Sequence, residues 1–164
     1  ARGSEGLEAA EGGTLTFMVG GSEDGFEKAR EYLEKMGKAV IHAGGPGAGQ
    51  AAKICNNMLL GASMAATCET FVLAEKLGLD PKVFFDISSK ASGQCWSMTS
   101  YCPVPGVGPE TPADREYEGG FAAALMLKDL KLAMAAAQES GAYTPMGGEA
   151  EELYQRFVDR GGGS

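Results

Sequence analysis

The feature that most constrains the fold is a long run of residues without a turn signal. After Pro46 the sequence continues as GAGQAAKICNNMLLGASMAATCETFVLAEKLG, and the first turn signal is Gly78. We expect one helix of about 30 residues, which at about 1.5 Å per residue spans roughly 45 Å. Small residues such as Gly61 and Ala65 let neighbouring helices approach closely. Because the run is apolar around most of its circumference, we expect it to be buried on several sides.

The residues before this helix have the pattern of a strand, a helix and a second strand. Thr14 to Gly20 is short, rich in strand-forming residues and followed by a second glycine. Residues 22–36 place apolar side chains at helical spacing behind an acidic first turn, and Gly37 ends that pattern. Lys38 to Gly44 again reads as a strand. These residues therefore predict a β-α-β unit.

The residues after the long helix predict shorter helices and one long loop. Asp80 followed by Pro81 is a strong helix start, with a capping side chain and a proline in the first turn. Residues 92–120 are rich in glycine and proline, and a loop of this length is often functional. Two further helices are expected, in residues 121–141 and 144–161.

The expected fold is mainly α and has two parts. Residues 1–45 carry the β-α-β unit, and residues 46–164 form an all-helical domain built on the long helix. The chain opens with ARGSEGLEAAEGG, has no initiator Met and stops abruptly at RGGGS. We therefore expect a fragment of a longer protein.

The charge of the chain argues against two classes of partner. It has 22 acidic and 14 basic residues, for a formal net charge of -8. Such a chain repels the phosphates of nucleic acids and anionic membrane surfaces, so we expect neither as a partner. No uninterrupted apolar run reaches the roughly 18 residues that suggest a membrane span. We also expect no metal site, because the four cysteines form no CxxC pair and the one histidine, His42, reads as a packed or edge residue.

The glycines at the start of the long helix imitate a dinucleotide-binding loop. Gly47, Gly49 and Ala52 fit the GxGxxG/A pattern between a strand and a helix. That mechanism needs a second parallel strand carrying an acidic residue about 20 residues later. Here the helix simply continues, so we interpret these glycines as a flexible turn that joins the β-α-β unit to the helical part.

Three polar residues early in the same helix are more informative than the glycines. Lys53 and Asn57 are four positions apart and share one face, and Asn56 lies at the edge of that face. A lysine in a partly apolar pocket exchanges protons closer to neutral pH. A neighbouring amide can hold a hydroxyl or a carboxylate. The alternative from spacing alone is that Lys53 extends to solvent and that the two asparagines cap nearby groups.

The order of several motifs resembles one enzyme family. GAGQAAKICNNM is followed by the small-residue helix and then by GLDP, SGQCW, YCPVPGV, YEGGF and LMLKDLKLA. This series, from about Gly13 to about Tyr154, is similar to the 3-hydroxyisobutyrate dehydrogenases, which belong to the β-hydroxyacid dehydrogenases. The region from Trp96 to Gly106 looks like the 3-hydroxyisobutyrate branch rather than the tartronate semialdehyde or glyoxylate reductase branches.

The resemblance implies a two-domain enzyme that binds NAD in an N-terminal Rossmann domain, of which residues 1–45 would be the last part. It implies that the helical domain supplies the catalytic lysine and the contacts of a homodimer or tetramer. Residue by residue, the implied roles are catalysis by Lys53, substrate binding by Asn57, Asn56 and Trp96, and cofactor binding by Lys128 and Phe121.

The implied reaction is NAD-dependent oxidation of 3-hydroxyisobutyrate to methylmalonate semialdehyde in valine catabolism, with Lys53 as the proton-transfer group. The alternatives are a tartronate semialdehyde, succinic semialdehyde or glyoxylate reductase of the same family, or a helical dimerisation module without activity. Relatives of this kind work in the mitochondrial matrix or the bacterial cytoplasm.

The sequence also departs from the family pattern. The GLGxMG nucleotide fingerprint, the substrate-binding Ser-Gly-Gly segment and the segment after the last helix are absent, so we expect this chain alone to be inactive. Gln94 stands where relatives often have a basic residue, and Cys102 stands where asparagine is common. These two positions bear on substrate preference.

Overall fold

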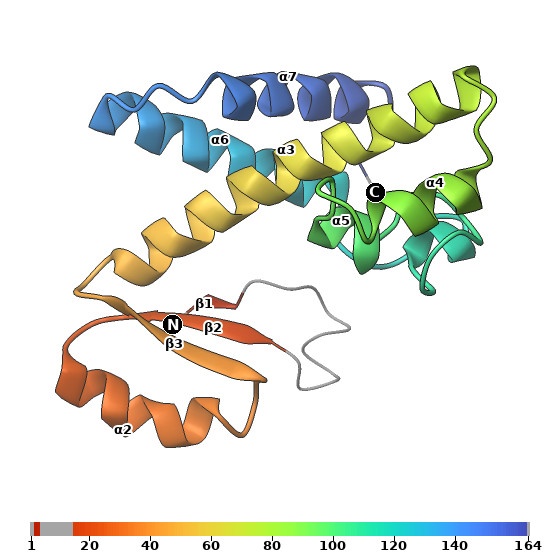
Figure 1. Cartoon of the computed structure of the whole chain (residues 1–164). Coiled ribbons are helices and arrows are strands. Elements are labelled where there is room, and N and C mark those ends of the chain that lie inside the picture. Colours follow the sequence, from red (N-terminus) through yellow and green to blue (C-terminus); the bar gives the residue numbers. More distant parts are fainter. Residues whose placement is uncertain (1, 4–14, 164) are drawn as a thin grey trace.

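A small sheet with one helix lies at one end of a larger group of helices (Figure 1). The structure is a computed structural model, and it describes residues 2–3 and 15–163. The long helix α3, Ala48–Lys76, runs from the sheet through the helical part and touches elements of both. The expected mainly α fold with a β-α-β part is confirmed.

The sheet has three strands in the order β1-β2-β3. The parallel pair is β2, Thr16–Gly20, and β3, Ala39–Gly44, with Thr16 opposite Ala39. Helix α2, Glu23–Leu33, connects them, so the expected β-α-β unit is present. The short strand β1, Arg2–Gly3, pairs antiparallel to β2 and was not predicted. Thr14, the expected first residue of the strand, lies outside the described residues.

Helix α2 is fixed to the sheet by one buried aromatic side chain. The Ser22 hydroxyl accepts a hydrogen bond from the Gly25 N–H at 3.2 Å and caps the helix. Phe26 is buried and stacks on the His42 ring of β3, with 4.7 Å between ring centroids. His42 Nε2 lies 2.9 Å from the Gly21 carbonyl oxygen. The histidine is therefore a packed residue, as the sequence suggested.

The glycine-rich turn brings α3 directly against β2. Gly47 is the N-cap residue of α3 and has a φ of 89°, a conformation that favours glycine. At Gly49, an added Cβ would lie 2.6 Å from the Met18 carbonyl oxygen and 2.8 Å from the Gly20 nitrogen. These two glycines therefore serve the turn and the close approach of two backbones. A dinucleotide-binding loop would require a further strand after α3. In the described part of the chain, no strand follows this helix.

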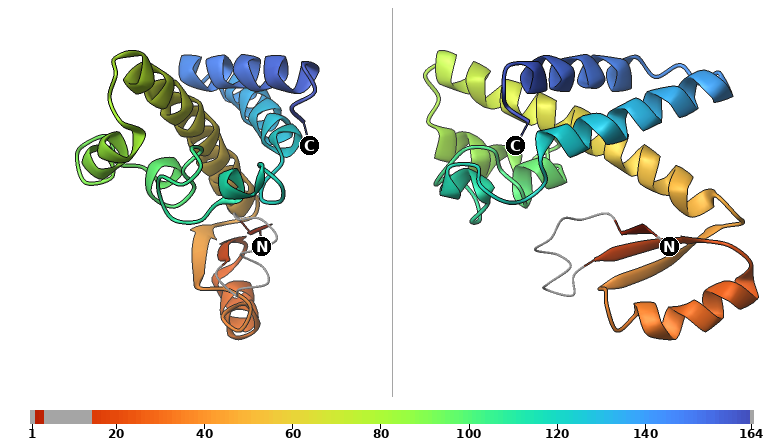
Figure 2. Two further views of the ribbon diagram at one scale, coloured as in Figure 1. Left: turned by 90° about the vertical axis from the view of Figure 1, so that its right-hand side faces the viewer. Right: turned by 180° about the vertical axis from the view of Figure 1, so that it is seen from behind.

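The helical part packs two hydrophobic clusters against α3. One cluster joins α3 to α6, Ala123–Ser140, and α7, Pro145–Asp159. It contains Met126, Leu130 and Ala150. The other cluster contains Phe71, Met98 and Cys102 and joins α3 to the short helices and the loop that follow it. Figure 2 shows α6 and α7 lying together along one side of α3.

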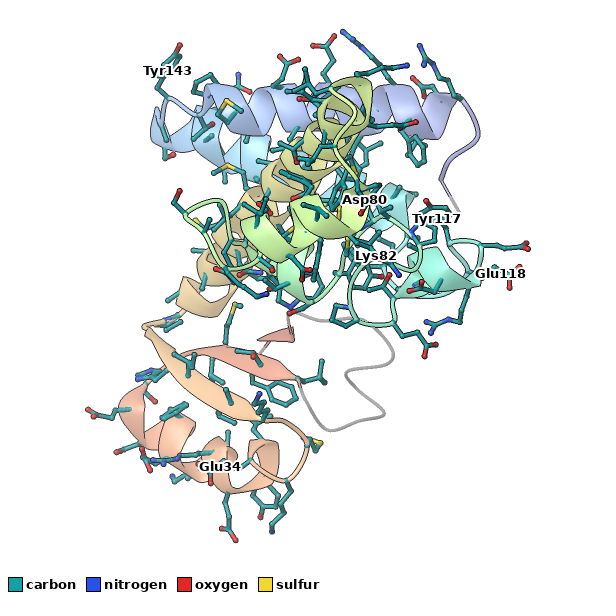
Figure 3. All side chains as sticks on the ribbon, turned by 45° about the vertical axis from the view of Figure 1, so that its right-hand side comes forward. Glu34, Asp80, Lys82, Tyr117, Glu118 and Tyr143 are labelled. Atoms are coloured by element: carbon teal, nitrogen blue, oxygen red, sulfur yellow. The ribbon has the colours of Figure 1, made fainter. Side chains whose placement is uncertain are left out.

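The connection from α3 to α6 contains three short helices: α4 (Pro81–Ser88), α5 (Trp96–Thr99) and the 3-10 helix η1 (Pro112–Arg115). Asp80 caps α4 by accepting from the N–H groups of Lys82 and Val83 at 2.9 and 3.1 Å. Figure 3 shows Asp80 and Lys82 at this end of α4, and Tyr143 pointing outward from the turn between α6 and α7. The expected loop of residues 92–120 is therefore folded around α5 and η1.

The burial of α3 differs from the sequence-based expectation. Leu59, Val72 and Leu73 are 68%, 57% and 58% exposed, so this helix is not buried on several sides within the chain. The expectation failed because an apolar surface indicates that a helix prefers a cover and does not say whether the same chain provides it. Among the described residues, α3 is also the one helix whose length and composition would suit a membrane span, a test that core helices also pass.

The close contact at Gly49 gives the first prediction. Replacing Gly49 by alanine should destabilise the chain by about 1–3 kcal/mol, because the new methyl group meets backbone atoms that cannot rotate away. The matched control is Gly148→Ala in α7, where an added Cβ has no atom within 4 Å. That change should stabilise by roughly 0.5–1 kcal/mol, because alanine favours the helix. Urea unfolding measures both, and equal effects would contradict the prediction.

The loop before α6 gives a prediction about pH. The Asp114 carboxylate accepts the N–H groups of Gly106 at 2.6 Å and Thr111 at 2.8 Å, and these bonds lower the pKa of Asp114. A carboxyl whose pKa is lower in the folded state stabilises the fold above its unfolded pKa of about 3.9 and loses that contribution as pH falls through the folded value. Asp114→Asn should therefore flatten the fall in unfolding temperature below about pH 4.

The control for this pH prediction is Asp86→Asn. Asp86 pairs with the exposed Lys90 at 3.6 Å, and an exposed pair of this kind contributes little. Thermal unfolding between about pH 2.5 and 6 compares the two variants with the unsubstituted chain, a window that brackets the carboxyl pKa. If Asp114→Asn leaves the fall in unfolding temperature below about pH 4 unchanged, the prediction is wrong.

Candidate active site

The candidate site begins with polar residues on one face of α3. Gln50, Lys53 and Asn57 follow one another at intervals of three and four residues, so their side chains leave the helix on the same side. Asn57 is 2% exposed, and the Lys53 side chain is 25% exposed. Lys53 is therefore only partly accessible, which rejects the alternative that it simply extends into solvent.

A buried carboxylate from α6 meets this face. Asp129 Oδ2 accepts a hydrogen bond from the Asn57 amide, with Nδ2 at 2.7 Å, and lies 3.4 Å from Lys53 Nζ. The Asn56 amide donates to Asn57 Oδ1 at 3.2 Å. A buried charge needs such partners, because desolvation otherwise costs several kcal/mol. The structure thus links Lys53, Asn57 and Asn56 through one carboxylate and one amide.

Asp129 was not among the residues singled out from the sequence. A signal for it is present, because Met126, Leu130 and Ala133 form the buried face of α6 and Asp129 lies on that same face. An acidic residue inside an apolar helical face requires a partner from another element. The partner could not be identified without knowing which helix packs opposite.

A cavity of about 120 Å³ opens beside this cluster. It is lined by residues of α3 and α6, namely Gln50, Lys53, Ile54, Lys128, Asp129 and Leu132. Two of these are cationic and one is anionic, so the lining carries a net positive charge within a chain of formal charge -8. The arrangement suits a small anionic ligand. Lys128 is exposed on α6, and the structure brings it to the same cavity as Lys53.

Trp96 and Phe121 both contact Tyr101, away from the cavity. The Trp96 ring stacks on the Tyr101 ring, with centroids 5.0 Å apart, and the Phe121 N–H donates to the Tyr101 hydroxyl at 3.1 Å. Gly120 has a φ of 72°, and a Cβ there would collide with the same hydroxyl. Neither Trp96 nor Phe121 lines the cavity beside Lys53. Their predicted binding roles therefore stay predictions.

The structure also gives the positions of Gln94 and Cys102, the two residues that depart from the family pattern. Gln94 is exposed and lies 3.4 Å from the Thr99 hydroxyl. Cys102 is 1% exposed in the cluster with Phe71 and Met98, so it is a core residue rather than a cavity residue. Burial raises the pKa of its thiol.

All four cysteines are free thiols. Over residues 2–3 and 15–163, no group of three potential ligands could hold a metal ion.

Comparisons with known proteins show the family of the chain. Residues 47–164 match the family described as the NAD-binding domain of NADP-dependent 3-hydroxyisobutyrate dehydrogenase. The chain belongs to the 3-hydroxyisobutyrate dehydrogenase family. Residues 3–45 match the NAD-binding domain of 6-phosphogluconate dehydrogenase. Both matches are to NAD-binding families, which supports the expected cofactor class.

Several relatives are similar over nearly the whole chain. A Mycobacterium tuberculosis 3-hydroxyisobutyrate dehydrogenase structure with L-serine shares 48% identity, with a TM-score of 0.92 over 97% of this chain and 55% of that one. A mitochondrial 3-hydroxyisobutyrate dehydrogenase of Drosophila melanogaster is 47% identical over 98% of this chain and 50% of its own length. An NAD-dependent L-serine dehydrogenase of Pseudomonas aeruginosa is 49% identical over 96% and 53%. The chain thus spans about half the length of these members of the family.

The buried cluster gives a prediction about stability. The coupling energy between Asn57 and Asp129, measured with the variants Asn57→Ala and Asp129→Ala and their combination, should be about 1–3 kcal/mol, because each single variant leaves the other partner of this buried hydrogen bond unpaired. The matched control is Arg30 with Glu34, an exposed pair at 2.6 Å. Its coupling should be much smaller, because water screens an exposed ion pair. Urea unfolding measures both cycles, and similar values would show that the buried pair is not special.

Proposed function

We propose that this chain is the part of an NAD-dependent 3-hydroxyisobutyrate dehydrogenase that supplies the proton-transfer lysine. The observation that carries the proposal is the position of Lys53, which lies 3.4 Å from the buried Asp129 carboxylate and lines a cavity with Lys128. In this arrangement one lysine is held in place by a carboxylate, and a second cation is left to attract an anionic ligand. Membership of the family supports the same reaction.

Each polar residue of the site has its own role in the proposed reaction. Lys53, in its neutral form, takes the proton of the substrate hydroxyl. Asp129 then lies close enough to stabilise the resulting ammonium, because opposite charges at this distance attract. One N–H of the Asn57 amide holds Asp129, and Asn56 holds the Asn57 oxygen. We propose that these amides also orient the substrate, which turns binding energy into alignment.

The cofactor fits the residues present only in part. The chemistry that NAD⁺ would supply at this site is that of a hydride acceptor for the substrate carbon. The net positive lining of the cavity suits a ligand with phosphates, and we propose that Lys128 binds the cofactor from the helical part. Phe121, whose backbone N–H is fixed by Tyr101, is proposed to lie along the same ligand. Trp96, stacked on that tyrosine, is proposed to border the substrate.

L-serine is a second candidate substrate, favoured by a specific observation. One relative is named an L-serine dehydrogenase, and one related structure contains L-serine. Both candidate substrates combine a carboxylate with a primary alcohol, and they differ in a methyl or an ammonium group on the carbon between. Lys53 would perform the same proton transfer on either. Reduction of tartronate semialdehyde, succinic semialdehyde or glyoxylate has no comparable observation in its favour, nor does a module without activity.

Self-association and location form part of the proposal. The exposed apolar residues of α3, Leu59, Val72 and Leu73, are suited to a second copy of the chain, which supports a homodimer or a larger homo-oligomer.

A Drosophila relative is named mitochondrial. We propose the mitochondrial matrix for a eukaryotic source and the cytoplasm for a bacterial one, with valine catabolism as the pathway.

Substitution of Lys53 tests the proposal in the complete protein that carries this chain. Lys53→Met should lower kcat for NAD⁺-linked oxidation of 3-hydroxyisobutyrate by about 100-fold or more, because methionine keeps the apolar stem and removes the proton acceptor. The affinity for NAD⁺ should change by less than about threefold, which is below the effect of losing one direct hydrogen bond. Steady-state kinetics with 3-hydroxyisobutyrate and with L-serine measure the first, and fluorescence titration measures the second.

Lys128→Met is the matched variant for this test. It removes the other lysine of the same cavity, and it should weaken NAD⁺ binding while leaving kcat at saturating NAD⁺ nearly unchanged. The proposal fails if both variants lose cofactor binding equally, or if the unsubstituted protein oxidises neither substrate. Higher kcat/KM for L-serine than for 3-hydroxyisobutyrate would keep the role of Lys53 and change the substrate.

A further inference from the structure

A pair of hydroxyl groups joins the short helix α5 to the long helix α3, which lies beside it (Figure 1). Ser97 of α5 is completely buried, and its Oγ lies 3.1 Å from Ser63 Oγ of α3. The Ser63 hydroxyl donates its one proton to the Leu60 carbonyl oxygen at 3.0 Å, so Ser97 is the donor in the contact with Ser63. The buried hydroxyl of Ser97 is therefore paired, as buried polar groups nearly always are.

A second contact between the same two segments lies one turn further along α3. Thr67 is buried, and its hydroxyl donates to the Ser63 carbonyl oxygen at 2.7 Å. The Cys95 sulfur lies 3.6 Å from Thr67 Oγ1, so the thiol is the donor in that contact. Cys95 immediately precedes α5. Two successive turns of α3 thus hold the start of α5.

These two contacts stand on either side of Trp96 in the sequence. Cys95 is the residue before it and Ser97 is the residue after it. The Trp96 side chain is itself 45% exposed and stacks on Tyr101. The backbone that carries the ring is therefore fixed, while the ring reaches the surface. A satisfied buried polar network selects one arrangement, because any other arrangement leaves a buried hydroxyl unpaired.

The helix that holds Trp96 is also the helix that carries Lys53. Ser63 follows Asn56 by seven positions, which is about two helical turns, so the two residues share one face of α3. Lys53 is ten positions before Ser63, or about 15 Å along the helix axis. One continuous helix therefore sets the position of Lys53 and, through Ser63, the position of the Trp96 backbone.

We propose that Ser63 and Ser97 are positioning residues, which hold Trp96 where it borders a small hydroxy acid such as 3-hydroxyisobutyrate or L-serine. Thr67 and Cys95 reinforce the same arrangement. The inference rests on the proposed function, because that function places Trp96 beside the substrate. Neither serine lines the cavity beside Lys53, so both act through Trp96.

The test compares Ser97→Ala with Ser22→Ala in the complete protein that carries this chain. Ser97→Ala removes one hydroxyl and leaves the Ser63 hydroxyl bonded to Leu60, so it creates no unpaired donor. Ser22→Ala is the matched control, because it removes the hydroxyl that caps α2 and lowers stability at a distance from α5. If Ser97→Ala does not fold, Thr67→Val replaces it, since valine keeps the shape of threonine and removes the acceptor for Cys95.

The first measurement is the fluorescence of Trp96, the only tryptophan in the chain. Its signal is the difference between the complete protein and a Trp96→Phe variant. Ser97→Ala should shift the emission maximum and increase quenching by acrylamide, because the ring is held less firmly and becomes more accessible. Ser22→Ala should leave both values unchanged.

The second measurement is the affinity for 3-hydroxyisobutyrate and for L-serine. Isothermal titration calorimetry is carried out with NADH present, which cannot accept a hydride, so binding is measured without turnover. Ser97→Ala should weaken binding by about 3- to 10-fold, the effect of one lost hydrogen bond. In a Trp96→Ala background, the same substitution should weaken binding no further, because its effect passes through the ring that is already absent. Ser22→Ala should leave both affinities unchanged.

Three results would overturn the inference. The first is an unchanged Trp96 signal in Ser97→Ala. The second is an equal loss of affinity with and without Trp96, which would show that the hydroxyl only supports the fold. The third is a Trp96→Ala variant that binds both acids normally. A protein that binds these acids and oxidises neither would contradict the proposed function, while the binding results would still decide the role of Ser97.

Discussion

The site depends on one buried carboxylate between two helices. Asp129 belongs to α6, yet its described partners, Asn57 and Lys53, both belong to α3. A carboxylate that is 5% exposed is tolerated only when its partners are in place, so the two helices must keep one register relative to each other. The same interaction that holds the helices together also fixes the position of the lysine. Stability and the proposed chemistry therefore rest on the same atoms.

The long helix makes this arrangement possible because it serves several contacts along its length. Its first turn touches the sheet through Gly49, and its second and third turns hold the polar cluster. Further along, Gly61 leaves room for the side chain of Leu130, which would lie only 3.0–3.1 Å from a Cβ added at that position. Phe71, further along, anchors the short helices and the loop. A rigid element of 29 residues transmits the position of each contact to the next. Separate shorter helices would need their own contacts to achieve the same order.

The elements of the fold could be predicted from sequence because each carries a local signal. The absence of a turn signal located α3, Gly141 marked the end of α6, and the Ser22 and Asp80 caps marked helix starts. The contents of the site could be predicted only in part. Lys53 and Asn57 have a spacing and a motif context, whereas Asp129 gains its meaning from neighbours 70 or more positions away. The exposure of Leu59 likewise depends on what covers α3, which no local pattern encodes.

The place of the cavity in the fold fits the role that we propose for Lys53. In open parallel sheets, ligands bind beyond the carboxyl ends of the strands. β2 and β3 end at Gly20 and Gly44, and the turn after β3 leads straight into the first residues of α3. Lys53 lies in the second turn of that helix, which belongs to the next part of the chain. In the proposed reaction, a ligand bound at the sheet would meet a lysine whose position is set by Asp129.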